Sequence, residues 1–319
     1  MNEGTNTELA IEAKGLVKVY DGDVLAVDGI NMIVEANTIY AMLGPNGAGK
    51  TTTFSMLTTL LEPTEGTAKV SGFDVLKQAN DVRRQIGVTF QETVLDNELA
   101  GRQALDYHGR LYSMDKVSRQ KKISELLALV ELEDAADRVI STYSGGMKRR
   151  LELIRGLMTS PSVLFLDEPT LGLDPQSRAR IGDYIQDLRE KEGLTVMLTT
   201  HYMDEAEQLA DKVGIIDHGK ILVEGTPAEL VDQMGADVII IQGSGNSEQF
   251  VERVNGLPYA EMVTSANGII QIGVGSGSRR LVEVLSQAHE VGYQVDDVSV
   301  SKPSLGDVFL KYTGRQFRD

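Results

Sequence analysis

The hydrophobic pattern of the first sixty residues changes its period at a glycine-rich turn. Residues 11–20 and 24–42 alternate apolar with polar side chains, which predicts short strands. The apolar run 38–43 leads into the turn, and residues 50–61 after it have the pattern of a helix. The sequence therefore predicts a strand, a turn and a helix in direct succession.

Further along the chain, strand-like runs alternate with helical patterns. The strand-like runs are residues 163–166, 195–199 and 213–216. Each is followed by a helix or a turn, and such alternation predicts an α/β domain with a mostly parallel sheet. Between 99 and 131 the apolar residues recur at helical spacing with no strand among them, and another helix is expected after Ser144. We therefore expect about residues 92–158 to form a helical insertion within the α/β domain.

The pattern changes again near Gly235, where a different succession of elements begins. The expected elements are a strand at 237–242, a helix at 247–255, two strands within 261–274, a helix at 279–290 and a strand at 295–301. The order β-α-β-β-α-β predicts a small ferredoxin-like α+β domain. The expected division is a disordered tail at 1–8, the α/β domain at 9–235 and an accessory domain at 236–319.

Composition and charge limit where such a chain can work. The 319 residues include 31 Lys and Arg against 47 Asp and Glu, a net charge of −16, and no Cys. This charge disfavours non-specific binding to nucleic acid or anionic lipid, and the lack of Cys excludes disulfides and cysteine catalysis. No run reaches the roughly 18 apolar residues of a membrane span, and the polar first residues do not resemble a signal peptide. We expect a cytoplasmic chain that does not cross a membrane by itself.

The glycine-rich turn carries the first candidate chemistry. Its sequence, GPNGAGKT at 44–51, fits the phosphate-loop pattern G-x-x-x-x-G-K-[ST] between a predicted strand and a predicted helix. Glycines let backbone N–H groups surround an anion, and the helix N-terminus adds positive potential. Lys50 would reach the β- and γ-phosphates and the Thr51 hydroxyl would bind Mg²⁺. The residues expected to hold a nucleoside triphosphate are Gly44, Pro45, Asn46, Gly47, Ala48, Gly49, Lys50, Thr51 and Thr52.

A second candidate is the acidic end of the predicted strand at 163–166. Asp167 and Glu168 follow the strand directly. The first carboxylate would face the metal held by the phosphate loop, and the second is placed to polarise the attacking water. A solvated acidic strand end would show the same letters. The upstream phosphate loop favours the functional interpretation, because a metal-bound triphosphate needs such an acid.

The segment Tyr143-Ser144-Gly145-Gly146-Met147 precedes that strand by one helix. Ser144 is a good helix N-cap, and Ser-Gly-Gly at a helix start exposes backbone N–H groups that can bind an anion. The run Lys148–Arg150 follows, an unfavourable position for cations near a helix N-terminus unless a polyanion approaches. By itself the segment could equally be a capped helix with a solvated basic face.

Together these segments resemble the ATP-binding subunit of an ABC transporter. The loop at 44–51, YSGGM at 143–147 and FLDEP at 165–169 are similar to the family's Walker A, LSGGQ and Walker B motifs. Further matches are Asp174 (the D-loop, in LGLDP), His201 (the switch histidine, in TTHYMDEAE), Gln91 (the Q-loop glutamine) and Tyr20 (where the family stacks an aromatic ring on adenine). The likeness covers roughly residues 9–230. It implies a phosphate-loop NTPase fold of the ABC type.

Two departures from the family pattern point to a branch of the family. The signature has Tyr143 and Met147 where Leu and Gln are usual, and Phe90 precedes the Q-loop glutamine in place of Pro. With the closing segment 302–310, the chain looks most like the daunorubicin/doxorubicin-resistance ATPases, a drug-export branch with a small C-terminal domain. Export of a drug or lipid rests on this resemblance.

The resemblance also implies a mechanism and partners. Two chains would pair head to tail, each ATP lying on one chain's Lys50 loop and capped by Ser144, Gly145 and Gly146 of the other. The implied Mg²⁺ ligands are Thr51, Gln91 and Asp167, and the implied catalytic residues are Lys50, Gln91, Glu168 and His201. The implied partners are a second ATPase subunit, with a homodimer favoured, and an integral membrane permease, which would hold the chain at the cytoplasmic face of the membrane.

Without the resemblance, several of these residues have other interpretations. His201 could be a hydrogen-bonded structural residue, Tyr20 an edge-strand aromatic, and Gln91 a surface amide. The acids in 204–207 are interpreted as a solvated helix face, and Lys148–Arg150 as a positioning surface because the net charge of −16 disfavours nucleic acid.

Two other function classes predict sequence features of their own. A soluble ABC ATPase that remodels ribosomes or DNA predicts two cassettes or a long coiled coil, and a basic surface. A phosphate-loop GTPase predicts an Asn-Lys-x-Asp motif, which is absent from the sequence. The transporter subunit is the favoured interpretation.

Overall fold

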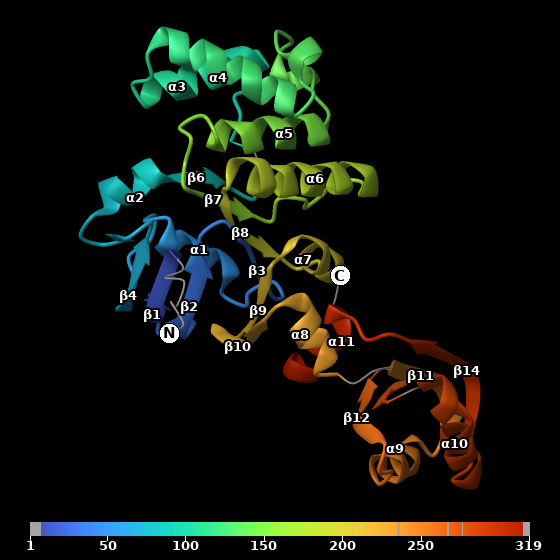
Figure 1. Cartoon of the computed structure of the whole chain (residues 1–319). Helices are drawn as coiled ribbons and strands as arrows, with labels where there is room; N and C mark the ends of the chain where they lie inside the picture. Colours follow the sequence, from blue (N-terminus) through green and yellow to red (C-terminus); the bar gives the residue numbers. More distant parts are fainter. Residues whose placement is uncertain (1–7, 93, 235–236, 267, 276, 315–319) are drawn as a thin grey trace, which may run out of the picture. The chain divides into compact units, whose positions relative to one another are not determined.

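A computed structural model describes residues 8–92, 94–234, 237–266, 268–275 and 277–314 of the chain (Figure 1). The chain forms two compact units, Met1–Leu222 and Val223–Asp319. The predicted boundary at 235/236 lies outside the described residues, and the units divide earlier, after Leu222. The reason is that α8 (Pro227–Asp232) contacts α11 (Leu305–Thr313), so both helices belong to the second unit.

The first unit is built around a six-stranded sheet. Its strands lie in the order β10-β9-β3-β8-β7-β6, and the pairs β9–β3, β3–β8, β8–β7 and β7–β6 are parallel, as predicted. The strands are β3 (Ile39–Leu43), β6 (Ile86–Thr89), β7 (Val163–Asp167), β8 (Thr195–Thr200), β9 (Lys212–Asp217) and β10 (Lys220–Gly225), and the boundary after Leu222 falls within β10. Every residue of β3, β7 and β8 is buried, which explains why these strands are continuous apolar runs.

A second, antiparallel sheet has four strands, and β3 of the six-stranded sheet lies between its second and third strands in the chain. Its order is β2-β1-β4-β5, made of β1 (Leu9–Tyr20), β2 (Val24–Glu35), β4 (Glu65–Val70) and β5 (Phe73–Asp74). The run predicted as strand at 24–42 is divided: β2 ends at Glu35, and Asn37, with φ of +60°, turns the chain before β3 begins. Of the predicted tail at 1–8, the structure describes only Glu8, whose carbonyl accepts a hydrogen bond from Ala36 N.

Helices complete the first unit. They are α1 (Lys50–Leu57), α2 (Ala79–Gln85), α3 (Gly101–Leu111), α4 (Lys116–Leu129), α5 (Gly145–Gly156), α6 (Pro175–Glu192) and α7 (Met203–Leu209), with short 3₁₀ turns at Glu133–Ala135 and Ile140–Thr142. The described residues between β6 and β7 hold helices and no strand, so the helical insertion is observed at the predicted place (Figure 1). Helix α1 is shorter than predicted, because Thr59 adopts a φ of +65°.

Helix α1 is fixed to the sheet by aromatic packing. Phe54 is fully buried and meets Phe165 of β7 edge to face at 5.7 Å between ring centroids, and Phe90 at 6.4 Å. Edge-to-face pairs of this kind add about 0.5–1.5 kcal/mol beyond the burial of apolar area. The phosphate loop, which ends where α1 begins, is therefore anchored on the strand that carries the two acids.

The second unit has the predicted order of elements. The strands β11 (Asp237–Gly245), β12 (Ala260–Ala266), β13 (Ile269–Val274) and β14 (Tyr293–Ser301) form an antiparallel sheet in the order β12-β13-β11-β14. The helices α9 (Ser247–Asn255) and α10 (Gly277–Glu290) follow the first and third of these strands. Phe250 stacks on Tyr293 at 5.0 Å in the core. Among the described residues, no helix has both the length and the apolar character needed to cross a bilayer.

Candidate nucleotide site

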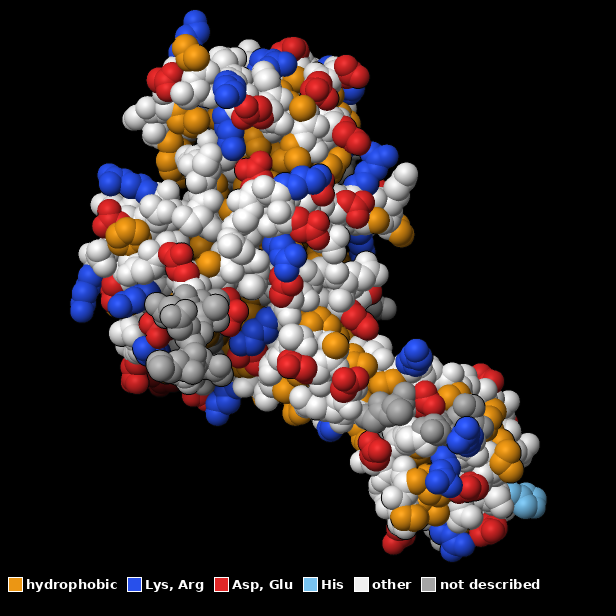
Figure 2. All heavy atoms as spheres, in the orientation of Figure 1, with side chains coloured by type: hydrophobic (Ala, Val, Ile, Leu, Met, Phe, Trp, Pro, Cys, Tyr) orange, Lys and Arg blue, Asp and Glu red, His pale blue; other side chains and the backbone are white. Residues whose placement is uncertain are grey.

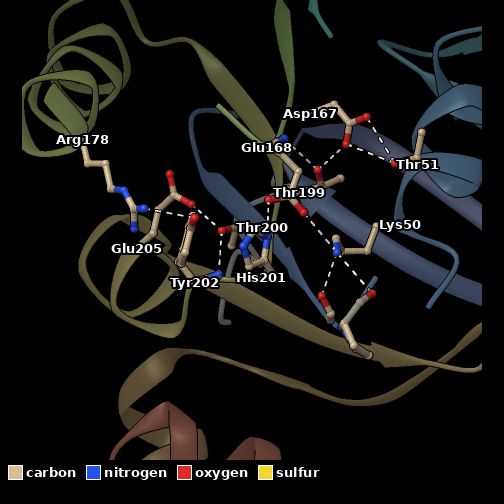
Figure 3. A network of polar contacts seen from close by, with 12 residues as sticks. Lys50, Thr51, Asp167, Glu168, Arg178, Thr199, Thr200, His201, Tyr202 and Glu205 are labelled. Carbon is tan, nitrogen blue, oxygen red and sulfur yellow. Dashed lines mark hydrogen bonds and ion pairs between the residues drawn. The ribbon is translucent and has the colours of Figure 1, made fainter. Parts of the chain in front are cut away.

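Three neighbouring parallel strands end at one edge of the six-stranded sheet and bring the predicted site residues together. In the pairing register, Leu43 of β3 lies beside Thr200 of β8, and Asp167 of β7 lies beside Thr199. The phosphate loop follows β3, Glu168 follows β7 and His201 follows β8. Figure 3 shows these side chains converging at that edge. Ligand sites in α/β sheets form at the carboxyl ends of the strands, as here.

The phosphate loop needs glycine where the backbone passes close to neighbouring strands. Gly49, directly before α1, has a φ of +106°, and a Cβ there would lie 2.6 Å from the carbonyl oxygen of Ala26. A Cβ on Gly44 would lie 2.4 Å from the carbonyl oxygen of Ile216. Both positions therefore exclude a side chain, and the loop is held tightly against the sheet.

Lys50 is buried beneath the loop with its ammonium group fully engaged. Its Nζ donates to the carbonyl oxygens of Gly44 (2.7 Å) and Pro45 (3.3 Å), and lies 3.1 Å from Glu168 Oε1. The ammonium group at the end of the loop therefore points at Glu168, the acid that directly follows β7 (Figure 3).

Glu168 is held from two sides. Opposite Lys50, the other carboxylate oxygen, Oε2, lies 2.6 Å from His201 Nδ1. The backbone of Glu168 has a φ of +48°, a left-handed conformation that costs a non-glycine residue about 1–2 kcal/mol. Its N–H donates to the hydroxyl of Thr199 at 3.0 Å. A buried carboxylate in a strained conformation between a lysine and a histidine has the features of a catalytic base.

Asp167 lies beside the loop's threonine. Thr51 Oγ1 donates to Asp167 Oδ2 at 3.2 Å, and Thr199 Oγ1 donates to Oδ1. Burial raises the pKa of the Asp167 carboxyl, and the hydrogen bonds from Thr199 and Thr51 oppose that rise. A carboxylate and a hydroxyl oxygen in contact are hard ligands that suit Mg²⁺. No group of three or more His, Asp or Glu side chains among the described residues could bind a metal unaided.

Behind His201 lies a group of side chains that sequence reasoning did not identify. Arg178 of α6 donates to the Leu173 carbonyl (3.0 Å) and to the Tyr202 hydroxyl (3.0 Å), with its guanidinium 3.9 Å from the Tyr202 ring centroid. The rings of Tyr202 and His201 lie 4.0 Å apart. His201 is thus packed against a tyrosine that Arg178 binds (Figure 3), and the same arginine binds the carbonyl of Leu173. Nothing in the sequence around Arg178 predicted this contact.

Glu205 corrects the interpretation of the acids in 204–207 as a solvated helix face. Its Oε2 accepts a hydrogen bond from Thr200 Oγ1, and its Oε1 is buried. Burial raises the pKa of Glu205 from an ordinary value of 4.5 to about 7, against the opposing effect of the hydrogen bond from Thr200. Asp204 and Glu207 are exposed, as predicted. The prediction fails for Glu205 because α7 packs on β3 and β8 and buries that face of the helix.

This burial predicts a pH-dependent gain in stability for Glu205→Gln. Between about pH 4.5 and 7 the folded carboxyl keeps a proton that the unfolded one has lost, so stability falls as pH rises through that window. The glutamine amide of the variant carries no charge, so its burial costs no charge desolvation at any pH. The variant should therefore melt several degrees above the parent at pH 8 and alongside it at pH 4.5, from a difference of at most about 3 kcal/mol. Thermal melts at both pH values test this, with exposed Asp204→Asn as the control. An equal shift at both pH values would contradict it.

Other predicted site residues lie near the cluster or on separate helices. Tyr20, 42% exposed at the end of β1, has its hydroxyl 3.5 Å from Thr52 Oγ1, beside the start of α1. Gln91 follows β6 with an exposed side chain. In the described part of the chain, no hydrogen bond joins Gln91 to Thr51 or Asp167, so it is not placed with the predicted metal ligands.

The signature segment and the D-loop begin two adjacent helices. Ser144 caps α5 by accepting from Met147 N at 3.2 Å, and Asp174 caps α6 by accepting from Ser177 N at 3.0 Å. A Cβ on Gly146 would lie 2.9 Å from Ser177 Oγ. A depression of about 150 Å³ lies here, lined by Ser144, Gly146, Met147, Arg150, Gln176, Ser177 and Arg180. Within the described residues, no hydrogen bond or ion pair joins these caps to Lys50 or Glu168.

Comparisons with known proteins show the family to which this chain belongs. The family model described as "ABC transporter" matches residues 27–171. The daunorubicin/doxorubicin resistance ATP-binding protein DrrA of Streptomyces peucetius is 41% identical over 99% of this chain and 96% of its own. The chain belongs to the ABC transporter family. As a member, it binds and hydrolyses ATP, and the predicted phosphate-loop fold and ATPase activity are confirmed.

Other relatives of this ABC subunit are similar over nearly their whole length. The linearmycin resistance ATP-binding protein LnrL of Bacillus subtilis is 35% identical over 97% of this chain and 100% of its own. Nod factor export ATP-binding protein I of Sinorhizobium fredii is 36% identical over 99% and 89%. Among solved structures, cbiO1 from Clostridium perfringens, part of the ABC transporter complex cbiONQ, has a TM-score of 0.66 at 26% identity over 70% of this chain and 91% of its own. A dimeric ATP-binding cassette with ADP and Pi has a TM-score of 0.61 at 25% identity over 68% and 98%.

The surface of the ABC subunit also bears on the nucleic-acid alternative. On the visible face of the described residues, Lys and Arg side chains are scattered among Asp and Glu, with no continuous basic patch (Figure 2). Nucleic-acid binding without sequence preference depends on clustered positive charge. The visible face therefore does not show the clustered positive charge that an ATPase remodelling nucleic acid predicts.

Proposed function

We propose that this chain is the motor subunit of an exporter that moves a hydrophobic compound, a drug or a lipid, through a separate membrane permease. The observation that carries the motor assignment is the Glu168 carboxylate, held between Lys50 and His201 beside Asp167. The export assignment is supported by relatives named for drug resistance and for Nod factor export. The expected location is the cytoplasmic face of the membrane, through contact with the permease.

The triphosphate would lie on the loop at 44–52, with adenine against Tyr20. The exposed ring of Tyr20 is within reach of Thr52 at the start of α1, where an adenine stacked on it would leave the phosphates over the loop. Loop N–H groups and the N-terminus of α1 supply positive potential for the phosphates. In this arrangement Lys50 exchanges its contact with Glu168 for the β- and γ-phosphates.

Mg²⁺ would bind to Thr51 Oγ1 and Asp167, whose oxygens already lie 3.2 Å apart. We propose Gln91 as a further ligand, which requires its exposed side chain to turn toward the loop. When bound, Mg²⁺ neutralises charge that develops on the phosphates.

Glu168 would act on the water that attacks the γ-phosphorus. As the new O–P bond forms and the bond to the β-phosphate oxygen breaks, the carboxylate accepts the water proton, and ADP and phosphate are released. His201 Nδ1, 2.6 Å from Oε2, holds the carboxylate in place. Release of Lys50 to the phosphates frees the second oxygen, Oε1, for the water.

The site would be completed by a second copy of the chain. Ser144, Gly145 and Gly146 begin a twelve-residue helix whose N-terminus is an anion site, and Asp174 caps the helix next to it. Among the described residues, neither forms a hydrogen bond or ion pair with Lys50 or Glu168 of its own chain. ATP on one copy would therefore meet the signature segment of the other, and ATP would close the dimer and hydrolysis open it.

Purification from membranes tests the proposed partner. The tagged full chain should be recovered from detergent-solubilised membranes with a near-stoichiometric integral membrane protein, identified by mass spectrometry. The chain taken from the soluble fraction of the same cells is the control, and it should carry no such protein. Recovery of ribosomes or DNA in place of a membrane protein would overturn the transporter assignment.

The unit Val223–Asp319 is proposed as the accessory domain of this motor.

A further inference from the structure

Helix α5 carries a buried arginine that reaches the end of the acid-bearing strand. Arg149 is 7% exposed, one turn after the Ser144 cap. Its NH2 donates to the carbonyl oxygens of Asp167 (3.0 Å) and Glu168 (2.9 Å), and its Nε donates to that of Pro169 (2.6 Å). One guanidinium thus binds three consecutive peptides around the catalytic acid.

The same guanidinium binds the segment that contains Gln91. Arg149 NH1 donates to the carbonyl oxygen of Phe90 (2.6 Å) and to Glu152 Oε2 (3.3 Å). Glu152, 0% exposed and one turn further along α5, accepts from Val94 N at 2.7 Å through Oε1. The Arg149–Glu152 pair therefore holds the residues on both sides of Gln91.

All five N–H donors of Arg149 have an acceptor in this arrangement. A guanidinium has five N–H groups in a fixed planar geometry, and a buried one is costly unless they are satisfied. Four of the acceptors are backbone carbonyls, one in the segment before Gln91 and three in the segment 167–169. The basic run Lys148–Arg150 was interpreted as a positioning surface. For Arg149 this is wrong in one respect: the side chain is internal.

We propose that Arg149, fixed by Glu152, is a positioning residue that couples the signature helix to Glu168 and to the Q-loop. Glu168 has a left-handed backbone, φ +48°, which directs its carboxylate between Lys50 and His201. Arg149 holds the carbonyls on both sides of that φ angle. A shift of α5, when it meets ATP on a second copy, moves these carbonyls with it. The inference rests on the proposed roles of Glu168 and of the signature segment.

The test compares Arg149→Gln with Arg119→Gln in the full chain. Arg119 is also 7% exposed, pairs with Asp106 at 2.6 Å and donates to the Met114 carbonyl, but lies in the helical insertion. Both variants should lower the melting temperature. Only Arg149→Gln should lower kcat at saturating ATP, by at least about tenfold, with the Kd for a fluorescent ATP analogue changed less than about threefold. An equal kcat for the two variants would overturn the proposal.

The Glu168→Gln background separates this proposal from the base assignment. If Arg149 acts through Glu168, then Arg149→Gln should not lower the residual rate of Glu168→Gln further. A further loss by the same factor would show that Arg149 acts elsewhere and would overturn the proposal. Normal turnover by Glu168→Gln itself would instead overturn the base assignment. If Arg149→Gln does not fold, Arg149→Lys serves in its place. It keeps the charge but cannot reach all five acceptors, so it should show an intermediate kcat.

Discussion

Glu168→Gln should bind ATP and almost stop hydrolysing it. The amide fills the same space between Lys50 and His201 but cannot accept a proton from water. Loss of a general base typically costs about 10²–10⁴-fold in rate, so kcat should fall by that factor. The Kd for ATP should change by less than about threefold, because Lys50 and the phosphate loop are intact. Phosphate release under saturating Mg·ATP and equilibrium binding of a fluorescent ATP analogue measure the two effects.

Asp204→Asn is the matched control for this variant. Asp204 is an exposed acid at the start of α7, three residues from His201. The substitution should leave kcat within about twofold of the parent's. A Glu168→Gln chain that hydrolyses ATP at the parent rate would show that another group activates the water.

Lys50→Ala should lose ATP binding along with turnover. The Lys50 ammonium is buried. Among the described residues, it alone bonds both to the carbonyls of the loop and to Glu168. Charge-assisted hydrogen bonds to buried groups are worth about 1.5–3 kcal/mol each, so affinity for ATP should fall roughly 10²-fold and kcat with it. Calorimetry or fluorescence titration with Mg·ATP gives the affinity, and phosphate release gives the rate.

Lys77→Ala is the control for charge alone, since Lys77 is exposed between β5 and α2. It should match the parent in both measurements. If Lys50→Ala binds and hydrolyses ATP as the parent does, the loop at 44–51 is not the phosphate site.

The order of buried strands and the glycine-rich turn made most of the site predictable. A continuous apolar strand is typical of a buried parallel sheet, in which the carboxyl ends of neighbouring strands lie at one edge. The pattern therefore predicted that Asp167 and Glu168, at the end of such a strand, would lie beside the phosphate loop. The strand β4 was missed for the opposite reason. Its six residues, 65–70, include only two that are buried, so the strand has little hydrophobic pattern.

Contacts between segments far apart in the chain could not be predicted. Arg149 follows a helix N-terminus, where a cation is unfavourable, and its carbonyl partners come from residues 18 to 59 positions away. Glu205 occupies a position typical of a solvated helix start, and only packing on the sheet buries it. Gln91 shows a further limit, because the resemblance predicted it as a ligand while its observed side chain is exposed.

The central claim is that ATP joins two copies of this chain at the Glu168 site. The most direct measurement is the mass of Glu168→Gln in solution, by light scattering, with Mg·ATP, with Mg·ADP and without nucleotide. We predict a doubled mass with ATP alone, and a single-chain mass for Lys50→Ala under every condition. A Glu168→Gln chain that binds ATP yet keeps the single-chain mass would show that ATP does not join two copies.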